Sequence, residues 1–215
     1  ATRSRSAISS WLSIVGGGTT DLSLIAVTEQ DGALELTRVA VGEHILLGGD
    51  NMDLTLAHLV KKKLKTNGVE LDRWQLQALT HGCRQAKETL LADATRDAVP
   101  LVVPSRGAKL IGGSIRTELT RTEVETTLID GFFPEVRVSD LPAERARGAL
   151  TKVGLPFAQD PAVTRHLAAF LTKQAGATAD LEGFVEHAHW ATFLHPTRCC
   201  STVACSMPRH CASGC

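Results

Sequence analysis

Residues 15–25, Val-Gly-Gly-Gly-Thr-Thr-Asp-Leu-Ser-Leu-Ile, place glycines, hydroxyls and a carboxylate at the mouth of an alternating apolar segment. Glycines let a backbone approach a bulky anion and adopt dihedral angles that other residues avoid. Successive amides in such a turn form a concave anion site. Asp21, two residues after Thr19, adds a carboxylate that can hold a magnesium-bound water. The segment therefore indicates a phosphate-binding turn between two strands.

An ordinary hairpin connection is the alternative interpretation, because glycine–threonine turns also join plain strands. The phosphate-loop motifs that precede a helix, Gly-x4-Gly-Lys-Ser/Thr and Gly-x-Gly-x-x-Gly, are absent from the sequence. Two further motifs follow the turn: Leu-Leu-Gly-Gly-Asp-Asn-Met-Asp at residues 46–53 and Cys-Arg-Gln-Ala-Lys-Glu-Thr-Leu at residues 83–90. The order of all three motifs is what decides between the two interpretations.

In this order the motifs resemble the second lobe of the ATPase domain in the seventy-kilodalton heat-shock chaperones, the DnaK-like family of the actin-like ATPase superfamily. The resemblance runs from about residue 15 to 128, with a diverged continuation to about 173, and indicates a distant branch. It implies an α/β fold, namely an actin-like ATPase (ribonuclease-H-like) lobe fragment with a helical and small-sheet insert subdomain. It also implies ATP and Mg²⁺ as cofactors. The partners implied for the intact parent are unfolded polypeptides and co-chaperones.

The resemblance also assigns roles to individual residues. The turn would grip the β- and γ-phosphates through backbone amides and one hydroxyl, while Asp21 would help to hold magnesium and its waters. Thr19 and Asp21 are the implied catalytic residues, and Lys87 would reach the ribose and the adenine edge. The implied nucleotide contacts are Gly16, Gly17, Gly18, Thr19, Gly48, Gly49 and Lys87.

Each role has a structural alternative. Asp21 can be a turn carboxylate at a strand end, the Gly48-Gly49 pair can be a helix-entry turn, and Lys87 can be an exposed helix lysine. These alternatives stay open from the sequence alone.

The chain departs from the family pattern at several positions. Arg84 stands where the common pattern has a glutamate, and Leu91 stands where it has a serine, so contacts to adenine are open. Ile14 stands where the family has an aspartate.

Charge and hydrophobicity exclude several function classes. The 215 residues include 23 basic and 23 acidic ones, with no basic stripe that would indicate nucleic-acid binding. The longest apolar runs are too short to span a bilayer, and no apolar run of signal-peptide length follows Arg3 and Arg5. We therefore expect a cytoplasmic location, with neither nucleic acid nor membrane as a partner.

Most cysteines lie close to the end of the sequence, at Cys199, Cys200, Cys205, Cys211 and Cys215. Together with His210 they suggest zinc, but their spacings match no Cys-x2-Cys knuckle. Back-translating residues 198–215 with ordinary codons and shifting by one base gives Leu-Leu-Phe-Asn-Gly-Gly and an amphipathic helix. That product resembles the family's adenosine loop. We therefore expect an out-of-frame tail that packs poorly and binds no metal.

The front end repeats this pattern. When the codons of residues 11–15 are shifted by one base and one inserted base is removed, they encode Leu-Ala-Val-Asp-Val before the glycines. This reading restores the aspartate at position 14. The expected organisation is an out-of-frame segment at 1–14, a partial lobe two at 15–197 with an insert subdomain at about 49–130, and an out-of-frame tail at 198–215. Genuine divergence at the two ends is the alternative.

Hydrophobic periodicity predicts the elements that position the motifs. Strands are expected at residues 22–27, 33–41, 99–104 and 109–119, and helices at 51–65 and 72–92. A capping box at Thr120 and Glu123 opens a helix through residue 128, and another helix starts at Asp160. Cys83 is expected in the core rather than as a nucleophile, and residues 131–157 are not assigned.

The resulting hypothesis is a fragment of an ATP-binding, ATP-hydrolysing DnaK-like molecular chaperone. Lobe one of the cleft is not among these residues, so we expect the chain alone to bind ATP weakly or not at all and to lack ATPase activity. One alternative is a fragment of another actin-like enzyme, such as a sugar or acid kinase. The other is a non-catalytic module that binds zinc through the cysteine-rich tail.

Overall fold

The computed structural model describes residues 8–30, 33–105, 113–143, 158–175, 177 and 198–203. Its strands are β1 (Ile8–Val15), β2 (Thr20–Gln30), β3 (Ala33–Val41), β4 (Ala98–Pro104), β5 (Ser114–Thr120) and β6 (Arg198–Val203). Its helices are α1 (Gly49–Thr66), α2 (Arg73–Ala92), α3 (Arg121–Glu125), a π-helical turn (Thr126–Asp130) and α4 (Val163–Lys173). The mixture of helices and small sheets confirms the predicted α/β class.

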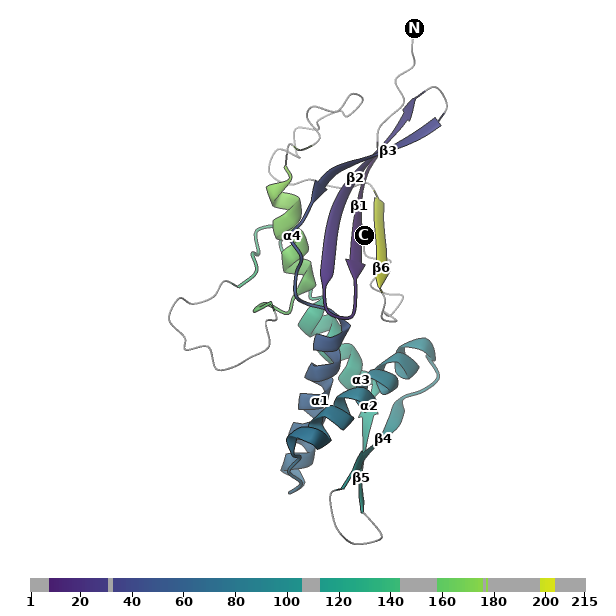
Figure 1. The fold of residues 1–215 in the computed structure, drawn as a ribbon, viewed down its shortest axis with the longest axis vertical. Helices are drawn as coiled ribbons and strands as arrows, with labels where there is room; N and C mark the ends of the chain where they lie inside the picture. Colours follow the sequence, from purple (N-terminus) through teal and green to yellow (C-terminus); the bar gives the residue numbers. More distant parts are fainter. Residues whose placement is uncertain are drawn as a thin grey trace.

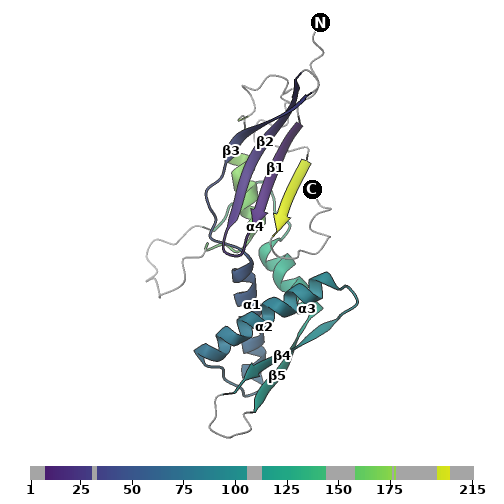
Figure 2. The same ribbon diagram turned by 45° about the vertical axis from the view of Figure 1, so that its right-hand side comes forward.

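The larger sheet has four strands in the order β3-β2-β1-β6 (Figures 1 and 2). β1 and β2 form an antiparallel hairpin, β3 pairs antiparallel with β2, and β6 runs parallel to β1. α4 lies along one side of this sheet (Figure 1), where Phe170 and Leu171 pack with Leu22 and Leu24 of β2. Alternation along β2 therefore buries one face of the strand beneath α4.

β3 exposes apolar side chains that the sequence pattern alone would assign to a buried face. Leu34 is 75% exposed and Leu36 is 69% exposed. β3 is an outer strand in the sheet order, and α4 packs on β2, so the described residues leave these side chains uncovered.

The second unit consists of α1, α2 and the β4–β5 hairpin (Figure 2). α1 and α2 contact each other through apolar stripes, and α2 packs on β4. The buried positions of α1 follow helical spacing, with Met52, Leu56, Val60 and Leu64 in one core with α2. The helix predicted at 51–65 and the one predicted at 72–92 are therefore confirmed.

Capping boxes fix the starts of two helices. The Asp72 side chain accepts a hydrogen bond from Gln75 N, and Gln75 Oε1 accepts one from Asp72 N. Thr120 and Glu123 make the same reciprocal pair before α3, as the sequence predicts. The following helix passes from α-helical to π-helical hydrogen bonding after Glu125 and ends at Asp130, close to the predicted end.

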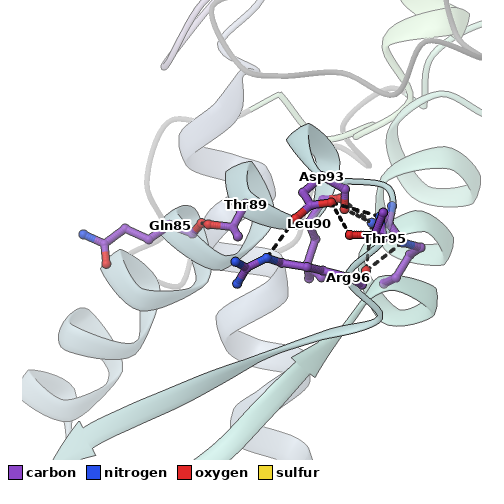
Figure 3. A network of polar contacts seen from close by, with 7 residues as sticks. Gln85, Thr89, Leu90, Asp93, Thr95 and Arg96 are labelled. Atoms are coloured by element: carbon purple, nitrogen blue, oxygen red, sulfur yellow. Dashed lines mark hydrogen bonds and ion pairs between the residues drawn. The ribbon is translucent and has the colours of Figure 1, made fainter.

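A polar network closes the C-terminal end of α2 (Figure 3). Asp93 accepts hydrogen bonds from the amide and hydroxyl of Thr95 and from Arg96 Nε, and these bonds lower the pKa of the carboxyl, with Thr95 as the main cause. Arg121 donates to the carbonyl oxygens of Leu90, Asp93 and Arg96 at 2.6–2.8 Å. The start of α3 is thereby tied to the end of α2.

Cys83 lies in the core, where burial and the nearby Asp53 and Glu123 carboxylates raise the pKa of its thiol to about 12. The thiolate is the reactive form, so we expect iodoacetamide at neutral pH to leave Cys83 unmodified in the folded chain. Peptide-level mass spectrometry separates it from the other cysteines, and the same reaction in urea is the control. Equal modification rates in both conditions would contradict the prediction.

The two ends that we expected to be out of frame include strands. β1 contains residues 8–14, and Arg198–Val203 pairs in register with β1. The expectation that the tail packs poorly stays a prediction. Residues 1–7 and 204–215, with Cys205, Cys211 and Cys215, lie outside the described residues. Among the described residues, no group of three His, Cys, Asp or Glu side chains is placed to hold a metal ion. The frame-shift hypothesis stays a prediction.

Candidate phosphate-binding site

The glycine-rich turn joins β1 to β2 at the end of the hairpin. Val15 and Thr20 form the last strand pair, and the Gly16 amide donates to the Thr19 carbonyl at 2.7 Å, which closes the turn. Within the described part of the chain, the amides of Gly17, Gly18 and Thr19 donate no hydrogen bond. A Cβ added to Gly18 would meet nothing within 4 Å. The turn therefore leaves three backbone donors without a partner among the described residues, as an anion site requires.

The first turn of α1 holds the glycine-rich turn from behind. Gly49 N donates to Gly16 O at 3.0 Å, and Asp50 N donates to Gly17 O at 2.7 Å. These amides begin a helix and would otherwise lack intrahelical partners. A Cβ on Gly48 would lie 2.5 Å from Gly17 O, so only glycine permits this approach. The predicted Gly48-Gly49 pair thus lies directly against the predicted turn.

Thr20 makes a second connection that the sequence did not reveal. Its buried hydroxyl donates to Leu47 O at 2.8 Å, and its backbone amide and carbonyl pair with Ile45. The start of β2, directly after the turn, is therefore attached to the segment entering α1. The clue in the sequence was the second threonine, because a buried hydroxyl needs a partner close by.

Asp21 lies beside the turn at the start of β2, with its side chain 38% exposed. Thr19 Oγ1 donates to Asp21 Oδ2 at 3.4 Å, and His44 Nδ1 contacts Asp21 Oδ1. Ile14 is the cross-strand partner of Asp21, and it is 43% exposed. The position where the family has an aspartate therefore shares a sheet face with Asp21.

Asp50 and Arg84 form a charged pair next to the turn. The Asp50 carboxylate oxygens lie 3.6 and 3.7 Å from where a Cβ of Gly17 would stand. Arg84 NH1 lies 3.9 Å from Asp50 Oδ1, and Arg84 Nε donates to Glu88 at 3.3 Å. Arg84 appeared in the sequence only as a departure from the family pattern, and neither its partner nor its position was predicted.

The Lys87 side chain lies in the protein interior and does not line the glycine-rich turn. Its ammonium is 2.6 Å from Asp53 Oδ1, and both side chains are almost completely buried between α2 and α1. Burial raises the pKa of the Asp53 carboxyl, and the ammonium of Lys87 opposes that rise. A contact from Lys87 to ribose or adenine stays a prediction, and it would require this pair to open.

The structure thus brings most of the predicted residues together. The turn at residues 16–19 lies next to Asp21, the buried Gly48-Gly49 pair supports the turn from behind, and Lys87 lies in the interior. The unpaired amides suit phosphate oxygens, and the Asp21 carboxylate is the hard oxygen ligand that Mg²⁺ prefers alongside phosphate and water. These residues fit a nucleotide phosphate chain with its metal. Gly48 and Gly49 use their own amides internally, on Asn51 Oδ1 and Gly16 O.

Comparison with known families identifies the family of the chain. The family model described as "Hsp70 protein" matches residues 12–138, more than half of the chain. The matched region contains the turn, the α1–α2 unit and the β4–β5 hairpin. In the part of the chain that the structure describes, no helix is long and apolar enough to cross a membrane. The chain belongs to the Hsp70 family.

Proposed function

We propose that these residues form one side of the ATP site of an ATP-hydrolysing chaperone, with an actin-like lobe as their fold. The observation that carries the proposal is the turn at residues 16–19, where three amides next to Asp21 have no acceptor among the described residues. The antiparallel β1–β2–β3 unit, the helical insert after β3 and the parallel return of β6 support the actin-like fold. In the intact parent, unfolded polypeptides and co-chaperones would be the partners, and the cytoplasm the location.

The proposed mechanism is mostly positioning. The amides of Gly17 and Gly18 and the hydroxyl of Thr19 would bind β- and γ-phosphate oxygens, while Asp21 would orient magnesium-bound water. The bound ion supplies charge neutralisation at the phosphates. The hydrogen bonds between the turn and α1 would hold these donors in place before the ligand binds. Donors that are already oriented can stabilise the charge that develops on the phosphates without first having to reorganise.

Titration with Mg²⁺-ATP followed by NMR tests this proposal. We expect the amide signals of Gly17 and Gly18 to shift with an affinity of about millimolar or weaker, because one side of a cleft supplies only part of the contacts. Asp21→Asn should remove the dependence of binding on Mg²⁺, and no turnover should be measurable. If ATP shifts none of these signals at saturating concentrations, the proposed function is wrong.

Ile14→Asp tests the metal site directly. The new carboxylate would stand opposite Asp21 on one face of the hairpin, where like charges destabilise by roughly 0.2–1 kcal/mol. We expect tighter binding of Mn²⁺, measured by paramagnetic broadening of the Asp21 signals, with only a small gain in ATP affinity. Ile14→Asn is the matched control without charge. A Mn²⁺ affinity equal in both variants would contradict the prediction.

We also propose the organisation expected from the sequence, with a partial lobe two at 15–197 and its insert at about 49–130. The break after β3, where the chain leaves the sheet for α1, supports the start of the insert. β6 begins at Arg198, where the shifted reading frame also begins with a strand. Sequencing the nucleic acid around codons 13–15 and 197–198 tests the frame-shift hypothesis, which fails if both frames are continuous.

A further inference from the structure

The helix α2 places an exposed cation, Arg84, beside the start of α1, whereas the α2 lysine that the family pattern assigns to the nucleotide is buried. Lys87 is enclosed with Asp53, whereas the side chain of Arg84, one turn earlier on α2, is 53% exposed. The guanidinium reaches toward α1, where NH1 lies 3.9 Å from Asp50 Oδ1. Arg84 is thus an exposed cation that α2 directs toward the start of α1.

Asp50 connects Arg84 to the turn. Its carboxylate lies 3.6 Å from the Cβ position of Gly17, and its own amide donates to Gly17 O. The carboxylate therefore lies between the guanidinium and the backbone that would hold phosphate. A phosphate placed over Gly17 would therefore meet the negative charge of Asp50, whose carboxylate lies 3.9 Å from the Arg84 guanidinium.

Two of the partners of Arg84 are exposed carboxylates. The side chain of Asp50 is 60% exposed and that of Glu88 is 41% exposed. Ion pairs at such positions contribute little, because water competes for both charges. A phosphate group offers a guanidinium two parallel charge-assisted hydrogen bonds, which are stronger than either contact. Exchange of a carboxylate for a phosphate is therefore favourable for Arg84.

We propose that Arg84 binds the phosphate chain of a nucleotide seated on residues 16–19, leaving Asp50 when the anion arrives. This inference rests on the proposed function and names a residue that determines affinity at the same site. It makes Asp50 a competitor of the anion and Arg84 the α2 residue that recognises the phosphates, whereas the resemblance implies a ribose and adenine contact for Lys87. Removing the charge of Asp50 should then strengthen phosphate binding.

Titration with sodium tripolyphosphate, followed by NMR at the Gly17 and Gly18 amides and at the Arg84 Nε–Hε group, tests the proposal. We expect Arg84→Gln to weaken binding about fivefold or more, while Arg84→Lys retains part of the affinity as a point charge. Arg73→Gln, an exposed arginine at the other end of α2, is the matched control and should stay within about twofold, as expected from long-range screening alone.

The same titration in an Asp50→Asn background separates direct binding from charge screening. If Arg84 contacts the phosphate, Arg84→Gln weakens binding in this background as well. If Arg84→Gln has no effect there, or no more effect than Arg73→Gln in the parent chain, the proposal is overturned while the loop signals still report binding. If tripolyphosphate and Mg²⁺-ATP shift no loop signal in any variant, the proposed function fails, and this inference fails with it.

Discussion

Replacing Lys87 with methionine is expected to destabilise the fold by about 3–5 kcal/mol at neutral pH, as for other buried pairs that lose one partner. The cause is Asp53, whose carboxylate would keep its charge in the core without the ammonium now 2.6 Å away. Urea unfolding followed by circular dichroism measures the loss. Lys65→Met on α1 is a suitable control, because the Lys65–Glu70 pair is largely exposed.

The pH dependence of this loss identifies its source. Burial already raises the pKa of Asp53, and removal of Lys87, which opposes the rise, should raise that pKa further. A folded-state pKa above the unfolded value means that stability falls as the pH rises through the folded-state pKa. The penalty of Lys87→Met should therefore shrink as the pH is lowered and Asp53 takes up a proton.

A double variant completes the test of the pair. Lys87→Met combined with Asp53→Asn leaves no buried charge at this position, so most of the stability should return. Two results would show that the ion pair does not stabilise the α1–α2 unit. One is a loss of unfolding free energy below about 1 kcal/mol in Lys87→Met, which is the range of an exposed ion pair. The other is a loss that does not change with pH. Lys87 would then be available to a nucleotide, as the family resemblance implies.

The sequence predicted the elements of the fold because their signals are local. Helical spacing of apolar residues, the Thr120–Glu123 capping box and the Gly16–Thr19 turn each depend on a few neighbouring residues, and the structure contains all of them. The orientation of Lys87 could not be predicted in this way. It depends on Asp53, which lies on another helix and far away in the sequence.

The charged residues around the turn show the same limit. His44, in the segment that connects β3 to α1, contacts Asp21 at the start of β2. Arg84 on α2 pairs with Asp50 on α1. Each pair joins side chains from separate elements, so no spacing within a motif indicates it. The exposure of Leu34 and Leu36 on β3 is equally non-local, because burial of a strand face depends on what packs over it.

Gly48→Ala is expected to destabilise the chain by about 3 kcal/mol, toward the upper end of single substitutions. Gly48 has an extended backbone with φ of −165°, so alanine is allowed there on conformational grounds. The cost comes from contact, because the new Cβ would lie 2.5 Å from Gly17 O and 2.6 Å from Gly16 O. The turn would have to separate from α1, with loss of the hydrogen bonds from Gly49 and Asp50 to its carbonyls.

Gly18→Ala is the matched substitution on the open side of the same turn. Its Cβ would meet no atom within 4 Å, so we expect urea unfolding to show no loss of stability. Binding of tripolyphosphate should nevertheless weaken, because the methyl group would occupy space that the anion needs near the backbone donors. A stable Gly48→Ala variant would show that the turn is not held by α1. Unchanged phosphate binding in Gly18→Ala would show that the anion approaches the turn from another side.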